Sequence, residues 1–329
     1  MQLMKLYWNP VTDAAYNLAL EECMTRSLKG SGILLWRNRN AVIIGRNQNT
    51  LAEINTDVLR DLDIQAVRRN TGGGTVYHDL GNLNYSCMAD VDENGGEISF
   101  EFFARPILAA LKSMGVDCVF SGRNDILYQD KKVSGTAKTI VDGRLLFHGT
   151  LLFDTDLTVL GKVLTPDTEK IQGKGIKSVR ARVTNLKEAL PGMTPDQFAE
   201  AMLAALLKQS GESAVSPIPE DLLARAEVLA EEKYRTHDWN YGNSPFFSFR
   251  KKQRFTGGTV EVALDVRRGT MENVAIRGDF FGERPVTELE DLLRGKTHDP
   301  EVIRRSLADV PFQTYINGVS LDEFLTLFI

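Results

Sequence analysis

The chain has 329 residues, 43% of them hydrophobic and 25% charged, which is the composition of a soluble globular protein large enough for two domains. Its formal net charge of −5 disfavours general nucleic-acid binding, and none of its apolar runs is long enough to cross a membrane. The first residues lack the layout of a signal peptide and the three cysteines are widely spaced. We therefore expect a cytoplasmic protein with reduced thiols and neither a nucleic-acid nor a membrane partner.

The first part of the chain predicts alternating short strands and helices. Apolar runs indicate strands at residues 3–8, 33–36, 41–44 and 64–68, and good helix formers indicate helices at 13–28 and 56–62. The turn-prone Asn38-Arg39-Asn40 between the second and third strands predicts a hairpin. These elements lead into a glycine-rich stretch at 68–82, which an alternating, half-buried strand follows at 83–88.

Closely spaced strands dominate the middle of the chain. A helix at 102–114, which contains Pro106, precedes strands at 116–120, 126–128, 132–138 and 145–153. Such spacing leaves little room for helical crossovers, so we expect an antiparallel or mixed sheet. Thr194, Pro195 and Gln197 then form a capping-box helix start, and a further helix is expected at 220–234.

A turn-rich segment at residues 236–245 marks the expected domain boundary. Strands at 260–266 and 274–276, followed by three helices of which the last is capped by Ser320 with Glu323, predict a small two-layer α/β module. The expected fold class is therefore α+β. Mixed, largely antiparallel sheets flanked by helices form one domain at 1–243, and a small accessory domain occupies 244–329.

The glycine-rich stretch is the first candidate site. Gly72, Gly73 and Gly74 follow Arg68 and Arg69 closely. A glycine run can turn successive N–H groups towards an anion, and arginines add positive charge and paired donors. We interpret the stretch as a cradle for phosphate or carboxylate, with a flexible surface turn as the alternative.

A second candidate is the strand around Lys132, which Asn124-Asp125 precedes. Strand alternation places Lys132, Ser134 and Thr136 on one face, with Lys131 in solvent. The lysine would then be a fixed positive charge beside two hydroxyls. The alternative is the solvated end of a hairpin.

The third candidate is a loop at residues 170–187 that has several basic residues and no acidic one. It suggests a phosphate- or nucleotide-binding loop that orders on binding, or else a solvated basic loop. It lacks the spacing of dinucleotide-binding and phosphate-loop motifs. His78 and His148 have no partner at zinc-ligand spacing and are interpreted as structural, and no cysteine neighbours a base that would make it a nucleophile.

Four blocks together resemble the lipoate-protein ligase A family. They are the stretch at 68–82, Asn124-Asp125, Lys132-Val133-Ser134-Gly135, and His148-Gly149-Thr150-Leu151. Their order and spacing also match, and the similarity extends through residues 173–185 and the C-terminal domain. The resemblance implies a biotin/lipoate ligase fold and an enzyme that uses ATP and Mg²⁺ to convert lipoate to lipoyl-AMP. It also implies that the lipoyl group passes to a lysine of lipoyl domains, in E2 subunits of 2-oxoacid dehydrogenases and in the glycine cleavage H protein.

The resemblance also assigns roles to residues. Lys132 matches the essential lysine. The positions implied for ATP and lipoyl-AMP binding are Arg69, Gly74, Thr75, Val76, Tyr77, Lys132 and, in a loop at 172–183, Gly173, Gly175, Ser178 and Arg180. Those implied for lipoate are Arg69, Gly72, Gly73, His78, Lys132 and His148. Asn124 and Asp125 are the nearest candidate oxygens for Mg²⁺, and Trp36 and Leu83 are candidates for an apolar tunnel. Asn70 and Thr71 stand where better-known members have serines.

Two alternatives stay open at this point. An octanoyl- or lipoyltransferase of the same fold would carry the acyl group on a cysteine, but none of Cys23, Cys87 and Cys118 lies in the loop at 172–183. A non-catalytic lipoate-binding module would have no need for both the lysine and the glycine cradle.

Overall fold

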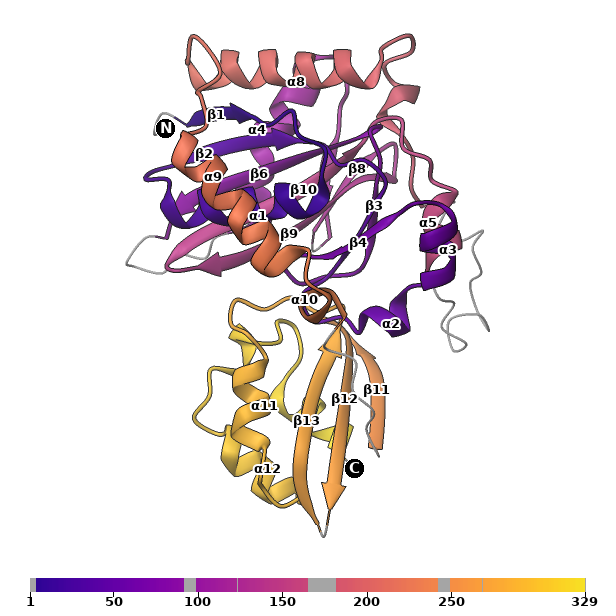
Figure 1. The fold of residues 1–329 in the computed structure, drawn as a ribbon, viewed down its shortest axis with the longest axis vertical. Helices are drawn as coiled ribbons and strands as arrows, with labels where there is room; N and C mark the ends of the chain where they lie inside the picture. The colour runs from indigo at the N-terminus through magenta and orange to yellow at the C-terminus, as the bar shows by residue number, and fades with distance from the viewer. Residues whose placement is uncertain are drawn as a thin grey trace.

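The computed structural model describes residues 4–91, 99–122, 124–164, 182–241, 249–267 and 269–328. A seven-stranded sheet with the order β1-β2-β6-β10-β9-β8-β7 forms the centre of the first domain (Figure 1). Only its β1 and β2 run parallel; all other neighbours are antiparallel. The strands are β1 (Lys5–Trp8), β2 (Gly32–Trp36), β6 (Asn82–Asp90), β7 (Val119–Ser121), β8 (Asp125–Tyr128), β9 (Lys131–Val141) and β10 (Arg144–Leu152).

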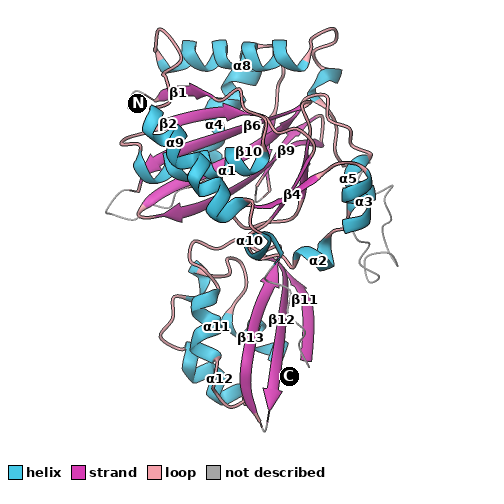
Figure 2. Ribbon diagram, viewed as in Figure 1, coloured by secondary structure: helices cyan, strands magenta, loops and turns pink. Residues whose placement is uncertain are grey.

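Helices cover both faces of this sheet (Figure 2). The helices α1 (Ala14–Ser27) and α9 (Glu220–Leu229) pack with Leu34, Trp36 and Leu146 into one core. On the other face α4 (Phe100–Ser113) and α8 (Pro195–Ser210) build a second core around Tyr85 and Phe147. Asp13 caps α1, and the capping box expected at Thr194 and Gln197 is present at α8.

A small sheet with the order β4-β3-β5 holds the glycine-rich stretch, in which β3 (Ala41–Ile44) is parallel to β4 (Gln65–Arg68) and antiparallel to β5 (Val76–His78). Residues 69–75 connect β4 to β5. The neighbours of the small sheet include the short helices α2 (Thr50–Glu53), α3 (Thr56–Asp61), α5 (Val159–Val163) and α10 (His237–Tyr241). The 3₁₀ turn η1 (Leu186–Glu188) and the π-helical turn η2 (Ala230–Tyr234) pack into the two cores of the large sheet.

The C-terminal residues have a core of their own. The strands β11 (Phe249–Phe255), β12 (Gly258–Arg267) and β13 (Thr270–Gly278) form an antiparallel sheet that α11 (Thr287–Leu293), α12 (Pro300–Leu307) and α13 (Leu321–Leu325) cover on one face, with 3₁₀ turns η3 (Phe312–Thr314) and η4 (Thr326–Phe328). Ser320 and Glu323 form the expected capping box of α13. The expected α+β class is confirmed. The boundary at 243/244 lies in residues 242–248, outside the described part, and stays a prediction.

Three details differ from the expectations. The hairpin at 33–44 is wrong, because β2 pairs with β1 and β6 while β3 belongs to the small sheet. Asn38 redirects the chain between them: its side chain accepts a hydrogen bond from Asn17 and its amide lies 3.1 Å from Nδ1 of His78. Strand β6 is buried on both faces over most of its length rather than half-buried, since helices cover both sides. The turn-rich segment at 236–245 contains the helix α10.

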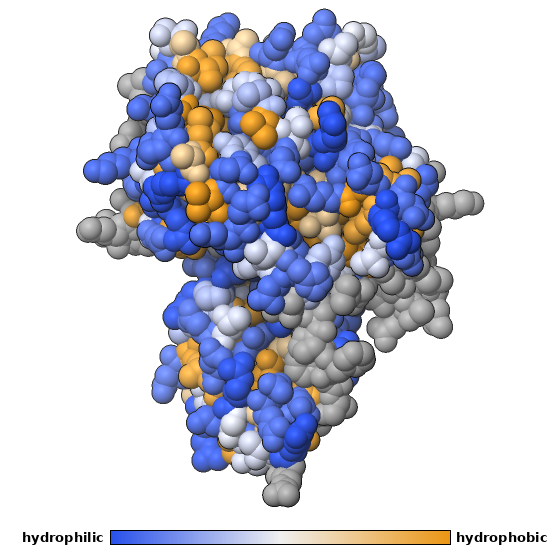
Figure 3. Space-filling model, in the orientation of Figure 1, coloured by the Kyte–Doolittle hydropathy of each residue, from blue (hydrophilic) through white to orange (hydrophobic). Residues whose placement is uncertain are grey.

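The surface in Figure 3 is largely hydrophilic, with small groups of hydrophobic side chains over the first domain. Among the described residues, no helix combines the length and the apolar character needed to cross a bilayer.

Candidate functional site

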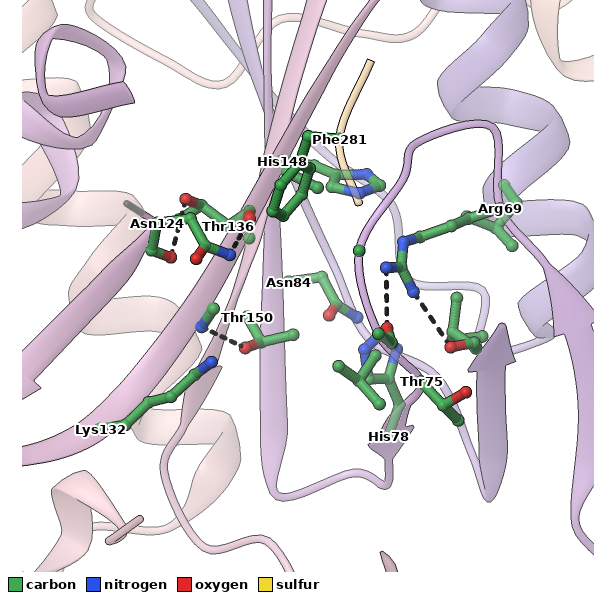
Figure 4. A pocket seen from close by; sticks show the side chains of 18 of the residues that line it. Arg69, Thr75, His78, Asn84, Asn124, Lys132, Thr136, His148, Thr150 and Phe281 are labelled. Carbon is green, nitrogen blue, oxygen red and sulfur yellow. Dashed lines mark hydrogen bonds between the residues drawn. The ribbon is translucent and has the colours of Figure 1, made fainter. Parts of the chain in front are cut away.

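A cavity of about 160 Å³ lies between the glycine-rich loop and the strands β9 and β10 (Figure 4). The loop and β5 contribute Arg69, Gly73, Gly74, Thr75, Val76 and His78. The opposite wall is formed by Lys132, Gly135, Thr136 and Ala137 of β9 and His148, Gly149 and Thr150 of β10. Leu18, Trp36 and Ile43 make part of the lining apolar, and Phe281 enters from the C-terminal domain.

Arg69 fixes the shape of the glycine loop from inside. Its guanidinium is buried and donates to the carbonyl oxygens of Gly72 at 2.7 Å, Gly74 at 2.8 Å and Ile43 at 3.1 Å. Burial lowers the pKa of Arg69 to about 10, which still leaves the side chain charged at neutral pH. The positive charge therefore lies directly behind the loop.

Glycine is required where the loop passes β3. A Cβ on Gly45 would lie 1.9 Å from the carbonyl oxygen of Gly73, and Gly73 itself has a φ of +90°. Such a contact and such a φ are both unfavourable for any residue with a side chain. The glycine at 45 matters to the site although it lies outside the glycine run.

The expectation that Arg68 binds an anion is wrong. Its side chain is 1% exposed and donates to the backbone oxygens of Gly45, Arg46 and Gln48 at 2.7–3.0 Å. Further bonds reach Trp239 and Asn240 of α10. Arg68 thus joins the polar loop after β3 to α10, because buried carbonyls need donors that the strands do not supply.

Glu21 of α1 supports the loop on its cavity side. Its Oε1 accepts from the Ser86 hydroxyl at 2.5 Å and lies 2.9 Å from Nδ1 of His148. The Nε2 of His148 lies 2.8 Å from Oγ1 of Thr71, and this Oγ1 also accepts from Nε of Arg69. Since Thr71 accepts from arginine, its hydroxyl proton is free to point at Nε2, and Nδ1–H then donates to the carboxylate.

The neighbouring Glu22 supports the loop from the opposite side. It accepts from the Asn70 amide, the Lys233 ammonium and the Tyr234 hydroxyl at 2.7–2.8 Å, and from Arg26 at 2.9 Å. Burial alone would raise the pKa of Glu22, but the charge and donors of Lys233, with Asn70 and Tyr234, lower it to about 2. Asn70 and Thr71 are thus held by consecutive glutamates, Asn70 directly by Glu22 and Thr71 through His148 by Glu21.

Lys132 stands where β9 is irregular. Ser134 pairs with Ile126 and Lys132 with Leu127, so Val133 is an extra residue and the alternation of faces is interrupted. The backbone of Lys132 bonds instead to Arg182 and Thr184. Its Nζ forms an ion pair of 2.7 Å with Asp125.

This bulge corrects the expected face of β9. Thr136 shares the cavity wall with Lys132, but Ser134 does not line the cavity; it is fully buried with its hydroxyl 3.5 Å from that of Tyr85. Lys131 is exposed, as expected.

His78 is a neutral donor at the cavity wall. Burial first, and then the charge of Arg69, lowers the pKa of His78 to about 3. Because the Asn38 amide donates to Nδ1, the proton lies on Nε2, and this atom has no hydrogen-bond partner among the described residues. The amide nitrogen of Asn84, another lining residue, is likewise unpaired within the described chain.

Comparisons with known proteins agree with this geometry. Residues 13–207 match the lipoyl protein ligase A/B catalytic domain, and residues 244–328 match the bacterial lipoate protein ligase C-terminus. Lipoate-protein ligase 1 of Staphylococcus aureus is 39% identical over 97% of this chain and 98% of its own length, and LplJ of Bacillus subtilis is 38% identical over 96% and 97%. The chain belongs to the lipoate-protein ligase family.

Three solved structures are similar to this chain in fold. Plasmodium falciparum LipL1 in complex with lipoate has a TM-score of 0.79 at 24% identity, over 98% of this chain and 97% of that one, which shows the shared fold. A bi-partite lipoate protein ligase with its E2 lipoyl domain from Thermoplasma acidophilum has a TM-score of 0.66 at 29% identity and covers 76% of this chain and all of that one. A lipoate-protein ligase A bound with ATP has a TM-score of 0.61 at 27% identity over 73% and 98%.

In this ligase-family chain the predicted site residues fall into three groups. Those that line the cavity are Arg69, Gly73, Gly74, Thr75, Val76, His78, Asn124, Lys132, His148 and, of the apolar candidates, Trp36. Those beside it are Gly72, Asp125, Tyr77, whose side chain packs on the far side of the small sheet, and Leu83, which belongs to a core of the large sheet. Gly173, Gly175, Ser178 and Arg180 lie outside the described residues.

Sequence reasoning missed several residues of the site, among them Glu21, Glu22 and Phe281. Glu21 and Glu22 lie in a helix of good helix formers, where glutamate needs no special explanation. Phe281 lies far along the chain, and its signal would have been a conspicuous aromatic pair, Phe280-Phe281, in a turn region of the second domain. Neither signal is specific without the structure.

Proposed function

We propose that the chain activates lipoate with ATP to lipoyl-AMP and transfers the lipoyl group to a lysine of a lipoyl domain. The observation that carries this proposal is that Lys132 and the arginine-backed glycine loop face each other across one cavity. Two anions, the lipoate carboxylate and the α-phosphate, must meet there. A fixed ammonium and backbone donors provide the charge that this meeting requires.

In the first step a carboxylate oxygen attacks the α-phosphorus and pyrophosphate leaves. Lys132 lies between the two anions, held by Asp125, and Gly73, Gly74 and Thr75 receive the phosphate. Arg69 provides charge behind the loop, while His78 and His148 form the lipoate wall. In the second step the acceptor amine attacks the mixed anhydride carbonyl, AMP leaves, and no cysteine is acylated.

Mg²⁺ fits this site as an ion whose ligands would be mainly the phosphate oxygens of ATP. Within the described ranges no three His, Cys, Asp or Glu side chains gather as a metal site. Asp125, which pairs with Lys132, and Asn124 of the cavity lining would supply two oxygens to the ion, which is the sparse protein ligation common for Mg²⁺. When bound, Mg²⁺ neutralises phosphate charge.

Further parts of the proposal rest on relatives. We propose E2 subunits and the H protein as acceptors, supported by the archaeal ligase structure that includes an E2 lipoyl domain. We also propose a loop at 172–183 that binds the adenylate through Gly173, Gly175, Ser178 and Arg180, a domain boundary at 243/244 and a cytoplasmic location, each testable by substitution, limited proteolysis or fractionation.

The test uses an apo lipoyl domain, lipoate, ATP and Mg²⁺, with acceptor mass and AMP as readouts. We expect mass gain only with ATP, and a loss of at least about 100-fold in Lys132→Ala because a charge at the reacting anions is removed. Lys131→Ala, at the exposed neighbour, is the control. A mass gain without ATP would indicate the transferase, no gain under any condition a binding module, and near-normal Lys132→Ala would refute the role of Lys132.

A further inference from the structure

A second cavity of about 400 Å³ lies between the two domains, behind the glycine loop. From the first domain it is lined by Glu22 and Arg26 of α1, Arg46 and Asn47 of the loop after β3, and Asn70. Residues 139–142 at the end of β9, Arg68, Lys233 and Trp239 complete that side. The C-terminal domain contributes Arg277, Pro285, Val286 and Thr287.

The lining carries an excess of positive charge. Five cationic side chains, those of Arg26, Arg46, Arg68, Lys233 and Arg277, face two carboxylates, those of Glu22 and Asp142. Glu22 is shared between Arg26 and Lys233, Arg26 also pairs with Asp142, and Arg277 is paired with Glu290 of α11 at 2.6 Å. The carboxylates available are therefore fewer than the cations gathered here.

Arg46 is the cation that this arrangement leaves unneutralised. Within the described part of the chain its guanidinium has neither a hydrogen bond nor an ion pair, although the residue is only partly exposed. Burial lowers the pKa of Arg46, with Glu22, Glu288 and Tyr234 opposing the shift, and an arginine stays protonated at neutral pH. A partly buried cation without a direct acceptor loses part of its hydration, and an anion in the cavity would compensate for that loss.

The backbone holds Arg46 at the domain junction. Its carbonyl accepts from Arg68 at 2.9 Å, and the carbonyl of the next residue, Asn47, accepts from Gly278 N–H of the C-terminal domain at 2.8 Å. These bonds fix the backbone of Arg46 at the junction, and its side chain lines the cavity. Its position therefore suits a planar donor of paired hydrogen bonds to an oxyanion.

We propose that this cavity is an oxyanion-binding site between the domains, which takes a phosphate-class anion through Arg46, Lys233 and Arg277. Pyrophosphate matches the charge excess better than monophosphate. It is also the leaving group of the proposed adenylation, and this last point alone rests on the proposed function. The anion would contact both domains and so stabilise the junction between them.

Titration calorimetry on the full chain with sodium pyrophosphate, phosphate, sulfate and AMP tests the site, in about 150 mM NaCl to screen nonspecific attraction. We expect pyrophosphate to bind most tightly and Arg46→Gln to weaken this binding about tenfold or more, because charge-assisted bonds are lost. Arg46→Lys should bind at an intermediate level. Arg60→Gln, at an exposed arginine of α3, is the control.

Two further variants make the outcome decisive. Thr287→Glu introduces a carboxylate at an exposed lining position of the other domain and should abolish binding without removing a buried side chain. Lys132→Ala should keep the Arg46-dependent binding, which separates this site from the reaction cavity and from the proposed activity. If AMP alone binds in an Arg46-dependent way, the source is a nucleotide phosphate and the site stands. Unchanged pyrophosphate affinity in folded Arg46→Gln and Thr287→Glu would overturn it.

Discussion

Glu22 should make the stability of the first domain depend on pH. Its carboxylate accepts from the side chains of Arg26, Asn70, Lys233 and Tyr234, so protonation removes the charge on which all these bonds depend. The substitution that tests this is Glu22→Gln, which keeps the size of the side chain and removes its charge.

The magnitude follows from the pKa of Glu22, which the folded chain lowers from 4.5 to about 2. Each unit is worth about 1.4 kcal/mol, so the ionised carboxylate contributes about 3 kcal/mol at neutral pH. Because the folded pKa is the lower one, this contribution is fully present above the unfolded pKa and is lost as the pH falls from about 5 to 2.

The assay is urea unfolding of wild type and Glu22→Gln at several pH values from 7 to 3. We expect the variant to be less stable by about 3 kcal/mol at pH 7, with a difference that narrows as the pH falls. Asp57→Asn, at an exposed carboxylate of α3, is the control. A difference between wild type and Glu22→Gln that is the same at pH 7 and pH 3 would refute the reasoning.

Three other changes have defined outcomes. Gly45→Ala should impair lipoate binding by calorimetry, since the added Cβ would lie 1.9 Å from the Gly73 carbonyl oxygen and displace the loop; unchanged affinity would contradict the close packing. Glu21→Ala should lower the free energy of unfolding by about 3 kcal/mol, because the Ser86 hydroxyl and the His148 Nδ1–H both lose a buried acceptor, and a loss below about 1 kcal/mol would argue against the network. Cys87 and Cys118, whose pKa burial raises to about 12, should resist iodoacetamide at pH 8 until the chain is unfolded, as mass spectrometry would show; rapid labelling of the native chain would be inconsistent with their burial.

Local chemical signals predicted local structure well. The capping boxes at Thr194 and Ser320 needed only four consecutive residues, and both are present. Strand pairing was harder because it depends on distant partners. The segment between β2 and β3 has a turn sequence, yet the buried amide of Asn38 ties it to Asn17 and to His78, forty residues further on. A hairpin prediction cannot include such bonds.

In the site, too, local features were predicted and contacts between distant residues were not. The glycine loop and Lys132 were predicted from residue types and motif spacing, and they line one cavity. The side chains of β9 that line the cavity were not all predicted, because alternation assumes a regular strand and Val133 is an extra residue. The different surroundings of the two arginines were not predicted: in sequence Arg68 and Arg69 are equivalent, but Arg68 ends β4 and Arg69 begins the loop. Arg69 donates to the Gly72 carbonyl of the glycine loop, whereas Arg68 donates to the Gly45 and Gln48 carbonyls of the loop after β3.

Two consecutive glutamates of α1 hold the glycine loop. Glu22 accepts a hydrogen bond directly from Asn70, whereas Glu21 is linked to Thr71 through His148. Between these supports Arg69 occupies the carbonyl oxygens of Gly72 and Gly74, the groups that would repel an anion. The N–H of Gly73 donates to the carbonyl of Phe280 at 3.3 Å. An anion can therefore accept from the Gly73 N–H only if the hydrogen bond from this N–H to Phe280 is broken. Anion binding at the loop and this contact with the C-terminal domain thus compete for one donor.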